Sequence, residues 1–181
     1  HGQDLPHLIE HLGVNDGQVL LSTDKVTPQE LARFYNSADF TVNIADAEGF
    51  GLATLESLAC GTPIIVNMTG GLQEQVTDGK NWFGWGCVPA SKSVIGSLQV
   101  PYIYEDRMGQ DQFEKMMNKA LKCSKKAYNN MSELGLKHID ENYNFENFEK
   151  NWVDKIDEII ENSGSWETRK NYARWQLKEI A

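Results

Sequence analysis

The sequence lacks the features of a membrane-spanning or disulfide-bonded protein. No apolar run approaches the roughly 20 residues that cross a bilayer, and no signal peptide is visible. The cysteines Cys60, Cys87 and Cys123 are odd in number, widely spaced and without a C-x-x-C pair. This spacing indicates neither a zinc knuckle nor a disulfide framework. A reducing environment fits best, and we expect a cytoplasmic protein.

Positive charge is also scarce. The chain has 17 Lys and Arg against 26 Asp and Glu, which gives a formal net charge of -9. This balance argues against a nucleic-acid-binding protein, because phosphate contacts need basic stripes. The 181 residues suffice for one full domain, or for one domain with a helical extension.

The most informative stretch is residues 46–56. The apolar residues 40–45 predict a buried strand before it, and residues 52–60 predict a helix after its turn. Gly49 and Gly51 allow backbone N–H groups to approach a ligand closely, and a helix N-terminus adds unpaired donors and the positive end of its dipole. The sequence therefore predicts an anion site at this turn.

Two glutamates flank the turn, Glu48 at the strand exit and Glu56 inside the helix. A carboxylate beside a phosphate is repelled, so these acids favour neutral hydroxyls next to the phosphates, as on a ribose or a hexose. Dinucleotide-binding folds use an acidic residue in this way on the ribose. A phosphate on backbone amides, with hydroxyls on flanking carboxylates, describes a nucleotide sugar.

The segment E-G-F-G-L-A-T-L-E, from Glu48 to Glu56, is an E-x7-E motif that resembles the retaining glycosyltransferases of GT-B family 4. Residues 31–39 resemble that family's helix before the strand, and residues 70–79 resemble its G-G-x-x-E-x-V-x-D-G segment. These segments lie within about the first half of the chain. The resemblance implies an α/β fold, a Rossmann-like parallel sheet flanked by helices, and the donor-binding, C-terminal half of a two-domain enzyme.

The resemblance also implies a domain organisation. Residues 1–144 would form the donor-binding domain, and residues 145–181 would form C-terminal helices. The last helix, predicted at 166–180, would return to an N-terminal, acceptor-binding domain, with its aromatic side chains in the interface. Those aromatics are Trp166, Tyr172 and Trp175. Because the chain starts without Met and its first segment already reads as a helix, we expect a fragment.

Site roles follow from the same resemblance. Glu48 is the expected catalytic residue, which binds the hexose hydroxyls and orders the sugar for attack, and Glu56 binds the ribose hydroxyls. The diphosphate would lie on the backbone of Gly49, Phe50, Gly51 and Leu52. The family transfers hexoses with retention and needs no metal, and no D-x-D motif stands before the site.

A further group of donor-binding residues is expected in the loop after a strand predicted at 18–22. Parallel sheets bind ligands outside the carboxyl ends of their strands, and in the family this loop lies against the nucleotide base. The group comprises Ser22, Thr23, Asp24 and Val26. Asp24 is either a solvated turn residue or an acceptor for the ring N–H and amino group of guanine. The second interpretation favours GDP-mannose over UDP-sugars as the donor, with an unknown acceptor.

The fragment by itself is expected to be inactive. In the family, an Arg and Lys pair reaches the diphosphate from a segment that would precede His1, and the acceptor-side groups come from the other domain. No suitable pair of cations stands near the motif in the sequence. We therefore expect residues 1–181 to bind a nucleotide weakly and to transfer no sugar.

The remaining helices and strands are predicted from hydrophobic periodicity and from the residues that begin and end such elements. Residues Thr27 and Glu30 form a capping box, with Pro28 at the first helical position. Further helices are predicted at 3–14, 111–131, 132–143 and 145–162, and a buried strand at 62–67. The apolar stripes expected to be buried are Leu31, Phe34, Tyr35 and Ala38, and later Phe148, Trp152, Ile156 and Ile159. The long segment 89–110 is expected to contain an excursion, either functional or packed as a hairpin. The glycines at 70 and 71 either contact the donor or serve a plain turn.

Other functions stay open. A sugar-nucleotide epimerase or a phosphorylase shares the GT-B frame, and a non-catalytic module would bind a nucleotide sugar without turnover. A dehydrogenase is disfavoured, because no G-x-G-x-x-G follows the first strand. His7 and His11 match an H-x-x-E-H zinc pattern without a third ligand, so we expect surface histidines and no metal site. A lysine row at 115–126 is either a solvated face or a weak contact with anionic lipid.

Overall fold

The computed structural model describes residues 4–171. The chain divides into two compact units, residues 1–31 and residues 32–181. The first unit contains helix α1 (Leu5–His11), which is capped by the Asp4 side chain accepting from the His7 N–H at 3.2 Å. None of its described helices, nor any in the second unit, is long and apolar enough to cross a membrane.

The strand predicted at 18–22 is wrong. These residues form turns and irregular structure, and Leu20 is 86% exposed. An apolar run becomes a strand only where a neighbouring strand accepts its backbone hydrogen bonds, and within residues 4–171 no strand pairs with this segment. The loop that follows it therefore lacks the strand end on which its predicted role depended.

Helix α2 (Pro28–Ser37) begins in the first unit and ends in the second. Its predicted capping box is confirmed. The Glu30 N–H donates to Thr27 Oγ1 at 3.3 Å, and the Thr27 N–H donates to Glu30 Oε2 at 2.9 Å. Burial of the whole apolar stripe is not confirmed, because Phe34 is 54% exposed.

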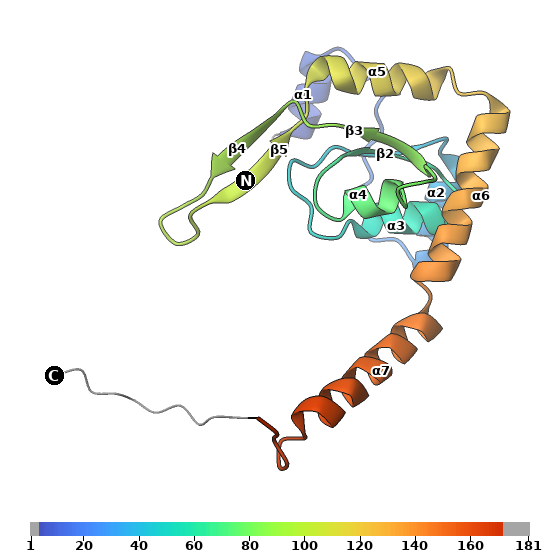
Figure 1. The fold of residues 1–181 in the computed structure, drawn as a ribbon. Coiled ribbons are helices and arrows are strands. Elements are labelled where there is room, and N and C mark those ends of the chain that lie inside the picture. The colour runs from blue at the N-terminus through green and yellow to red at the C-terminus, as the bar shows by residue number, and fades with distance from the viewer. Residues whose placement is uncertain (1–3, 172–181) are drawn as a thin grey trace. The chain divides into compact units, whose positions relative to one another are not determined.

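The second unit is built on a three-stranded parallel sheet, which confirms the predicted α/β class (Figure 1). Strand β2 (Ile64–Asn67) lies between β1 (Thr41–Asn43) and β3 (Gly84–Cys87). Every residue of β2 is buried, as expected for a central parallel strand covered on both faces. The sheet therefore places the turn after β1 and the turn after β2 at the same edge.

Helices cover the sheet and close the core. Helices α3 (Leu52–Ala59) and α4 (Leu72–Val76) lie on one side of it and α5 (Gln110–Leu121) on the other (Figure 1). Helix α6 (Lys125–Asn142) packs against α3. The core consists of Leu58, Ile64, Val66, Leu72, Val76 and Phe83.

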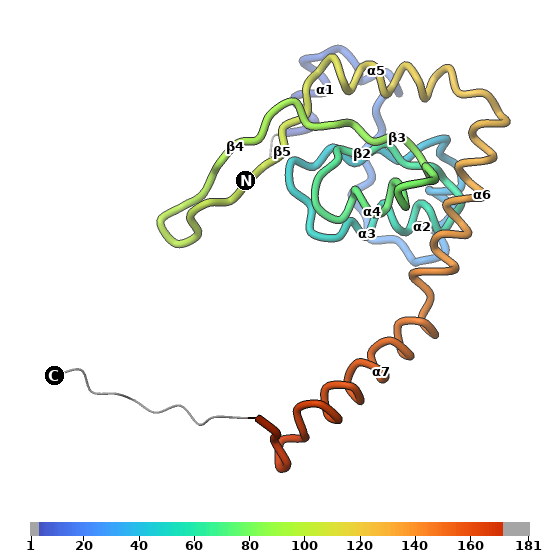
Figure 2. The backbone as a smooth tube through the Cα atoms, in the orientation of Figure 1, coloured from blue at the N-terminus to red at the C-terminus, as the bar shows by residue number. Residues whose placement is uncertain are grey.

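The long segment 89–110 contains an antiparallel hairpin, as expected. Strands β4 (Ser91–Ile95) and β5 (Ile103–Arg107) pair with Ser91 opposite Arg107 and Ile95 opposite Ile103. The tube in Figure 2 shows the hairpin extending away from β3, with its turn at the far end. The root of the hairpin therefore lies at the edge of the three-stranded sheet, and its tip lies away from that sheet.

The helix predicted at 111–131 is wrong in its end. It is interrupted between α5 and α6, where the Ser124 side chain accepts from the Ala127 N–H at 3.2 Å and starts a new helix. In the sequence, a serine inside a helical pattern can be either the cap of a new helix or a surface residue of one long helix. Sequence periodicity alone therefore did not locate the break.

Helix α7 (Phe145–Ser163) carries the last predicted stripe, and the expected burial is wrong. Phe148 is 58% exposed and Trp152 57%, and α7 has no buried residue. Residues 166–171 form no helix, and Trp166 is 83% exposed. The rest of the helix predicted at 166–180, including Tyr172 and Trp175, lies outside the described residues, and the domain boundary at residue 144 stays a prediction.

Candidate functional site

The predicted anion corner lies between β1 and α3. Gly51 stands at the start of α3 in the left-handed region, with φ 88° and ψ 60°. A Cβ at Gly51 would come within 2.7 Å of Leu72 Cδ2, so glycine is required both by conformation and by space. The N–H groups in the first turn of a helix have no intrahelical partners, and here no side chain caps them either. Leu52, in that turn, is 68% exposed.

A buried amide fixes the backbone of this turn. The side chain of Gln75, on α4, is 1% exposed, and its Nε2 donates to the Phe50 carbonyl at 2.5 Å. Its Oε1 lies 2.5 Å from Thr54 Oγ1, which also lies 2.8 Å from the Gly51 carbonyl. One hydroxyl proton serves only one of these acceptors at a time. The amide therefore joins α4 to the Phe50 carbonyl directly, and to α3 through the Thr54 hydroxyl when that hydroxyl donates to it.

The two glycines after β2 form the turn into α4, which was one of the two predicted alternatives, and they also meet the backbone of the segment after β1. A Cβ on Gly70 would lie 1.7 Å from the Glu48 carbonyl oxygen, and a Cβ on Gly71 would lie 2.7 Å from the Phe50 carbonyl oxygen. Backbone therefore packs directly on backbone here. The segments after β1 and β2 approach so closely only because both residues lack side chains.

The two glutamates have different surroundings. Glu48 is partly buried, and Glu56 is exposed on α3. Tyr35 Oη donates to Glu56 Oε2 at 3.0 Å. Burial, and then the hydrogen bond and negative charge of Glu56, raise the pKa of Tyr35 to about 12. Tyr35 therefore orients this carboxylate and leaves its other oxygen available to a further donor.

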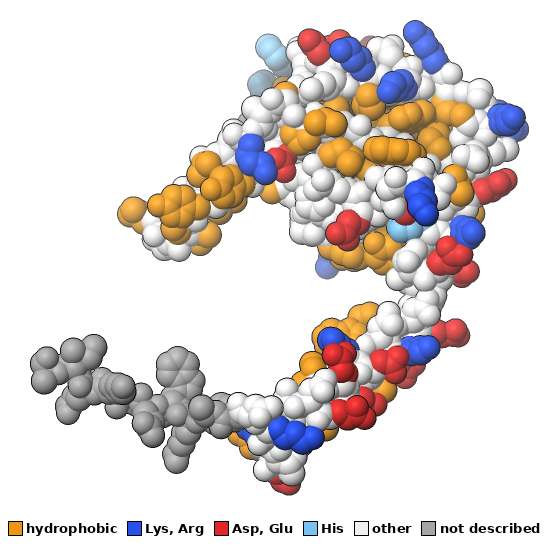
Figure 3. Space-filling view, in the orientation of Figure 1, with side chains coloured by type: hydrophobic (Ala, Val, Ile, Leu, Met, Phe, Trp, Pro, Cys, Tyr) orange, Lys and Arg blue, Asp and Glu red, His pale blue; other side chains and the backbone are white. Residues whose placement is uncertain are grey.

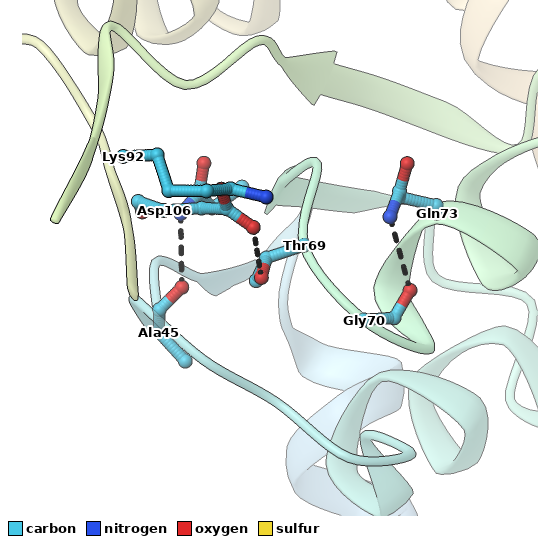
Figure 4. Close-up of polar contacts among 7 residues, drawn as sticks. Ala45, Thr69, Gly70, Gln73, Lys92 and Asp106 are labelled. Carbon is cyan, nitrogen blue, oxygen red and sulfur yellow. Dashed lines mark hydrogen bonds and ion pairs between the residues drawn. The ribbon is translucent and has the colours of Figure 1, made fainter. Parts of the chain in front are cut away.

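The root of the β4–β5 hairpin is attached to the same edge of the sheet. Asn67 donates from Nδ2 to the carbonyls of Ala45 and Asp106, at 3.0 and 2.6 Å. Asp106 donates its N–H to the Asp46 carbonyl at 2.7 Å and accepts from Thr69 Oγ1 at 2.8 Å. Figure 4 shows Thr69 facing the Asp106 carboxylate beside Lys92, with Gln73 bonded to Gly70 nearby. The hairpin thus connects the segments that follow β1 and β2.

The hairpin also brings cations to this edge, which the sequence did not indicate. Arg107 Nη1 pairs with Asp46 Oδ2 at 2.6 Å, two residues before Glu48 in the chain, and Arg107 Nη2 pairs with Glu105. Lys92 Nζ lies 3.4 Å from Asp106 Oδ1 and is 61% exposed. Both cations are paired with acids. Their positive charges balance the acidic charges at the edge of the sheet, whether or not they also contact a phosphate.

An aromatic-lined cleft of about 520 Å³ adjoins the turn on its other side. Phe50 contacts Tyr143 edge to face, with ring centroids 6.1 Å apart. Phe148 and Trp152, from α7, also line the cleft, with Leu55 from α3. The Phe50 side chain therefore faces Tyr143 and α7, and its backbone leads into the start of α3.

The predicted site residues fall into two groups. The structure brings together those on the turn between β1 and α3, which are Glu48, Gly49, Phe50, Gly51, Leu52 and Glu56. The others belong to the first compact unit, where they form an exposed stretch without helix or strand: Ser22, Thr23, Asp24 and Val26. Within residues 4–171, no three His, Cys, Asp or Glu side chains are grouped to hold a metal.

Sequence reasoning missed the supporting residues. Tyr35 and Gln75 lie inside the segments that carry the resemblance, but a tyrosine on a helix and a glutamine after two glycines give no separate signal. Asp106 and Arg107 lie 50 and 51 residues after the end of the motif at Glu56. Only their spatial proximity, which a linear pattern does not contain, makes them part of this edge.

Solved structures define the class of fold. Sucrose-phosphate synthase from Thermosynechococcus elongatus matches with a TM-score of 0.63 at 20% identity, over 88% of this chain and 34% of that one. The C-terminal domain of a glycosyl transferase group 1 family protein (LpcC) from Francisella tularensis matches with a TM-score of 0.56 at 20% identity, over 78% and 62% of the two chains. The chain is a C-terminal, Rossmann-like domain of the GT-B type.

The particular family is shown by sequence. The chain belongs to the glycosyl transferases group 1, whose family model matches residues 2–138. A D-inositol 3-phosphate glycosyltransferase from Paenarthrobacter aurescens (strain TC1) is 40% identical over 77 residues, which are 42% of this chain and 18% of that protein. One from Corynebacterium urealyticum (strain ATCC 43042 / DSM 7109) is 38% identical over 106 residues, 59% of this chain and 22% of that protein. The matched regions thus span about a fifth of these relatives' length.

Proposed function

We propose that this chain is the donor-binding half of a retaining hexosyltransferase and holds a nucleotide sugar at the turn between β1 and α3. One observation carries the proposal. The uncapped start of α3, on a left-handed Gly51, is fixed by buried hydrogen bonds and flanked by Glu48 and Glu56. Oriented N–H groups favour a diphosphate, and the flanking carboxylates accept from sugar hydroxyls. The family assignment supports the same interpretation.

In this proposal each residue acts through position and charge. The N–H groups at Phe50, Gly51 and Leu52 stabilise the diphosphate as it leaves. Glu48 accepts from hexose hydroxyls and orders the sugar, so that the acceptor attacks on the face that the diphosphate vacates. Glu56 uses the oxygen not engaged by Tyr35 for the ribose hydroxyls. No metal is required in this scheme, and an acceptor-binding domain supplies the attacking hydroxyl.

For the donor we propose GDP-mannose. The argument rests on the side-chain chemistry of Asp24 and not on the strand predicted before it: the carboxylate is suited to accept from the ring N–H and the amino group of guanine, a donor pair that uracil and adenine lack. Asp24 is exposed, and therefore accessible to a base. The loop residues Ser22, Thr23 and Val26 would then form the surface beside the base.

Calorimetric titration of the 181-residue chain with GDP-mannose, UDP-glucose and NAD tests the proposal. We expect GDP-mannose to bind, and Glu56→Gln to weaken binding by more than about 1 kcal/mol, the size of a hydrogen bond to a charged group. Glu133→Gln is the matched control, since Glu133 is exposed on α6, outside the site. Equal effects of the two variants would contradict a role for Glu56, and binding of NAD alone would contradict the donor class.

A further inference from the structure

The tip of the β4–β5 hairpin is apolar and uncharged. Residues 93–104 contain no Asp, Glu, Lys or Arg, in a chain of which 24% is charged. Leu98 is 99% exposed, Tyr102 75% and Val94 59%. Figure 3 shows apolar side chains gathered along this projection. An exposed apolar patch of this kind marks a surface that binds protein or lipid.

Both faces of the tip are apolar. Val94 lies opposite Tyr104, and Ile95 lies opposite Ile103. Since successive strand residues point to opposite faces, the first pair occupies one face and the second pair the other. A hairpin that packs on a protein through one face usually keeps the other face polar. Apolar side chains on both faces favour immersion of the tip in an apolar layer.

The backbone of the turn is suited to such a layer. The Ser97 N–H donates to the Val100 carbonyl at 3.0 Å. Ser97 Oγ accepts from the N–H groups of Gln99 and Val100, at 3.3 and 3.2 Å. A backbone amide without a partner is strongly disfavoured in hydrocarbon, and here these donors have partners within the turn. The tip can therefore leave water without leaving these three amides unpaired.

Polarity rises from the tip to the root. Tyr102 and Tyr104 follow the apolar turn, and tyrosine is a residue of the membrane–water interface. Lys92 and Arg107 stand at the root, at headgroup level if the tip is immersed. Their charges are balanced by Asp106 and by Asp46 with Glu105. From tip to root, the hairpin thus carries apolar residues, then tyrosines, then charged pairs, which is the order of polarity across a bilayer surface. It lacks the excess of positive charge that binding to anionic lipid requires.

We propose that the β4–β5 hairpin inserts its tip into the interfacial layer of a phospholipid bilayer, driven by burial of apolar side chains and not by lipid charge. The outer edges of both strands lack strand partners among the described residues, so insertion stops at the hydrated interface. Because Asp106 bonds the root to the segments after β1 and β2, an inserted hairpin holds the candidate site beside the lipid. The inference stands independently of the proposed donor.

Co-sedimentation of the 181-residue chain with phosphatidylcholine vesicles tests this inference. We expect binding in low salt that persists at about 0.5 M NaCl, where charge attraction is screened within a few ångströms. Leu98→Asp should weaken partitioning by more than about tenfold, because a fully inserted leucine is lost. Leu121→Asp is the matched control: this leucine is 81% exposed on α5, away from the hairpin, and partitioning should not change. Circular dichroism of both variants checks that the fold is kept.

Four outcomes overturn the inference. Absence of vesicle binding by the parent chain does so, as does binding that disappears in high salt. Equal losses in the two aspartate variants would show that the tip is not the contact. If the chain instead dimerises without vesicles, and Leu98→Asp abolishes the dimer while vesicles bind neither form, the tip is an interface between copies of the chain.

Discussion

At the scale of single residues, the glycines around the site differ in what the structure demands of them. Gly51 and Gly70 each need both a positive φ, 88° and 47°, and the absence of a Cβ. Gly49 has no heavy atom within 4 Å of a Cβ position, and its φ is outside the left-handed region. All three look alike in the sequence. Their roles separate only when the neighbouring backbone is known.

This difference predicts unequal effects of the same substitution. Gly70→Ala should lower the free energy of unfolding by more than about 2 kcal/mol, because the new Cβ would lie 1.7 Å from the Glu48 carbonyl oxygen. Gly49→Ala should change it by less than about 0.5 kcal/mol. Urea denaturation of both variants measures this. Similar losses in the two would show that the segments after β1 and β2 are not packed backbone to backbone.

Tyr35 predicts a dependence of stability on alkaline pH. Its pKa is raised to about 12 by burial and by Glu56, so folding favours the neutral phenol. That contribution is fully present below the unfolded pKa of about 10 and is lost as the pH rises to about 12. Tyr35→Phe should therefore lose stability less steeply over this range than the parent chain. Chemical denaturation at a series of pH values compares the two proteins, with Tyr104→Phe as an exposed control. If the free energy of unfolding fell equally with pH in the parent chain and in Tyr35→Phe, Tyr35 would not cause the alkaline loss of stability.

At the scale of elements, amphipathic periodicity predicted helices correctly and their burial incorrectly. Helix α7 has the apolar spacing of a packed helix, yet none of its residues is buried. The period of a helix reports that one face is apolar, and the tertiary structure decides what covers that face. The hairpin is the opposite case. Its length predicted an excursion that could pack as a hairpin, but the register of its two strands was not readable from the sequence.

Two isoleucines test the exposure of α7. Ile156→Ala should lower the free energy of unfolding by less than about 1 kcal/mol, since the side chain is 47% exposed. Ile64→Ala, at a residue of β2 with 0% exposure, should cost about 2–5 kcal/mol. Thermal or urea denaturation of the two variants provides the comparison. A loss at Ile156 as large as that at Ile64 would mean that the α7 stripe is buried in solution.

At the scale of the whole molecule, the chain is strongly acidic and the proposed donor is an anion. The net charge of -9 repels a diphosphate at long range, so binding depends on oriented N–H groups and on locally placed cations. The start of α3 supplies the first, and Arg107 and Lys92 at the hairpin root lie at the same edge, each paired with an acid. The proposal therefore predicts that binding depends on these local groups and not on the overall charge of the chain.

The proposal predicts stabilisation by the donor without a metal. GDP-mannose at about 100 times its dissociation constant should raise the free energy of unfolding by about 2.7 kcal/mol. A chelator should not change this shift, because no metal takes part in the scheme. Thermal unfolding with GDP-mannose, with and without chelator, gives the result. Residues 1–181 alone should transfer no sugar to any acceptor, and a radiolabelled-donor assay that detected transfer would contradict the proposal that an acceptor-binding domain outside these residues is required.

The sequence by itself determined the features that are local or carried by a motif. These are the α/β class, the turn between β1 and α3 with its two glutamates, the capping box at Thr27 and the membership of the glycosyl transferases group 1. The turn and the capping box each depend on residues within about ten positions of one another, where backbone preference and helix periodicity act, and the class and the family membership depend on several such segments along the chain. A short motif can encode such a turn because its geometry is set by its own residues.

Only the tertiary structure decided the long-range contacts. It joined Gln75 to Phe50, Tyr35 to Glu56 and Asp106 to Asp46, and it left residues 18–22 without a strand partner. These outcomes depend on which distant groups satisfy a buried donor or acceptor, and a linear pattern does not encode that choice. The same reason explains why the exposure of the hairpin tip was not predicted. An uncharged segment can be buried or exposed, and only the fold shows that no other described residues cover this one.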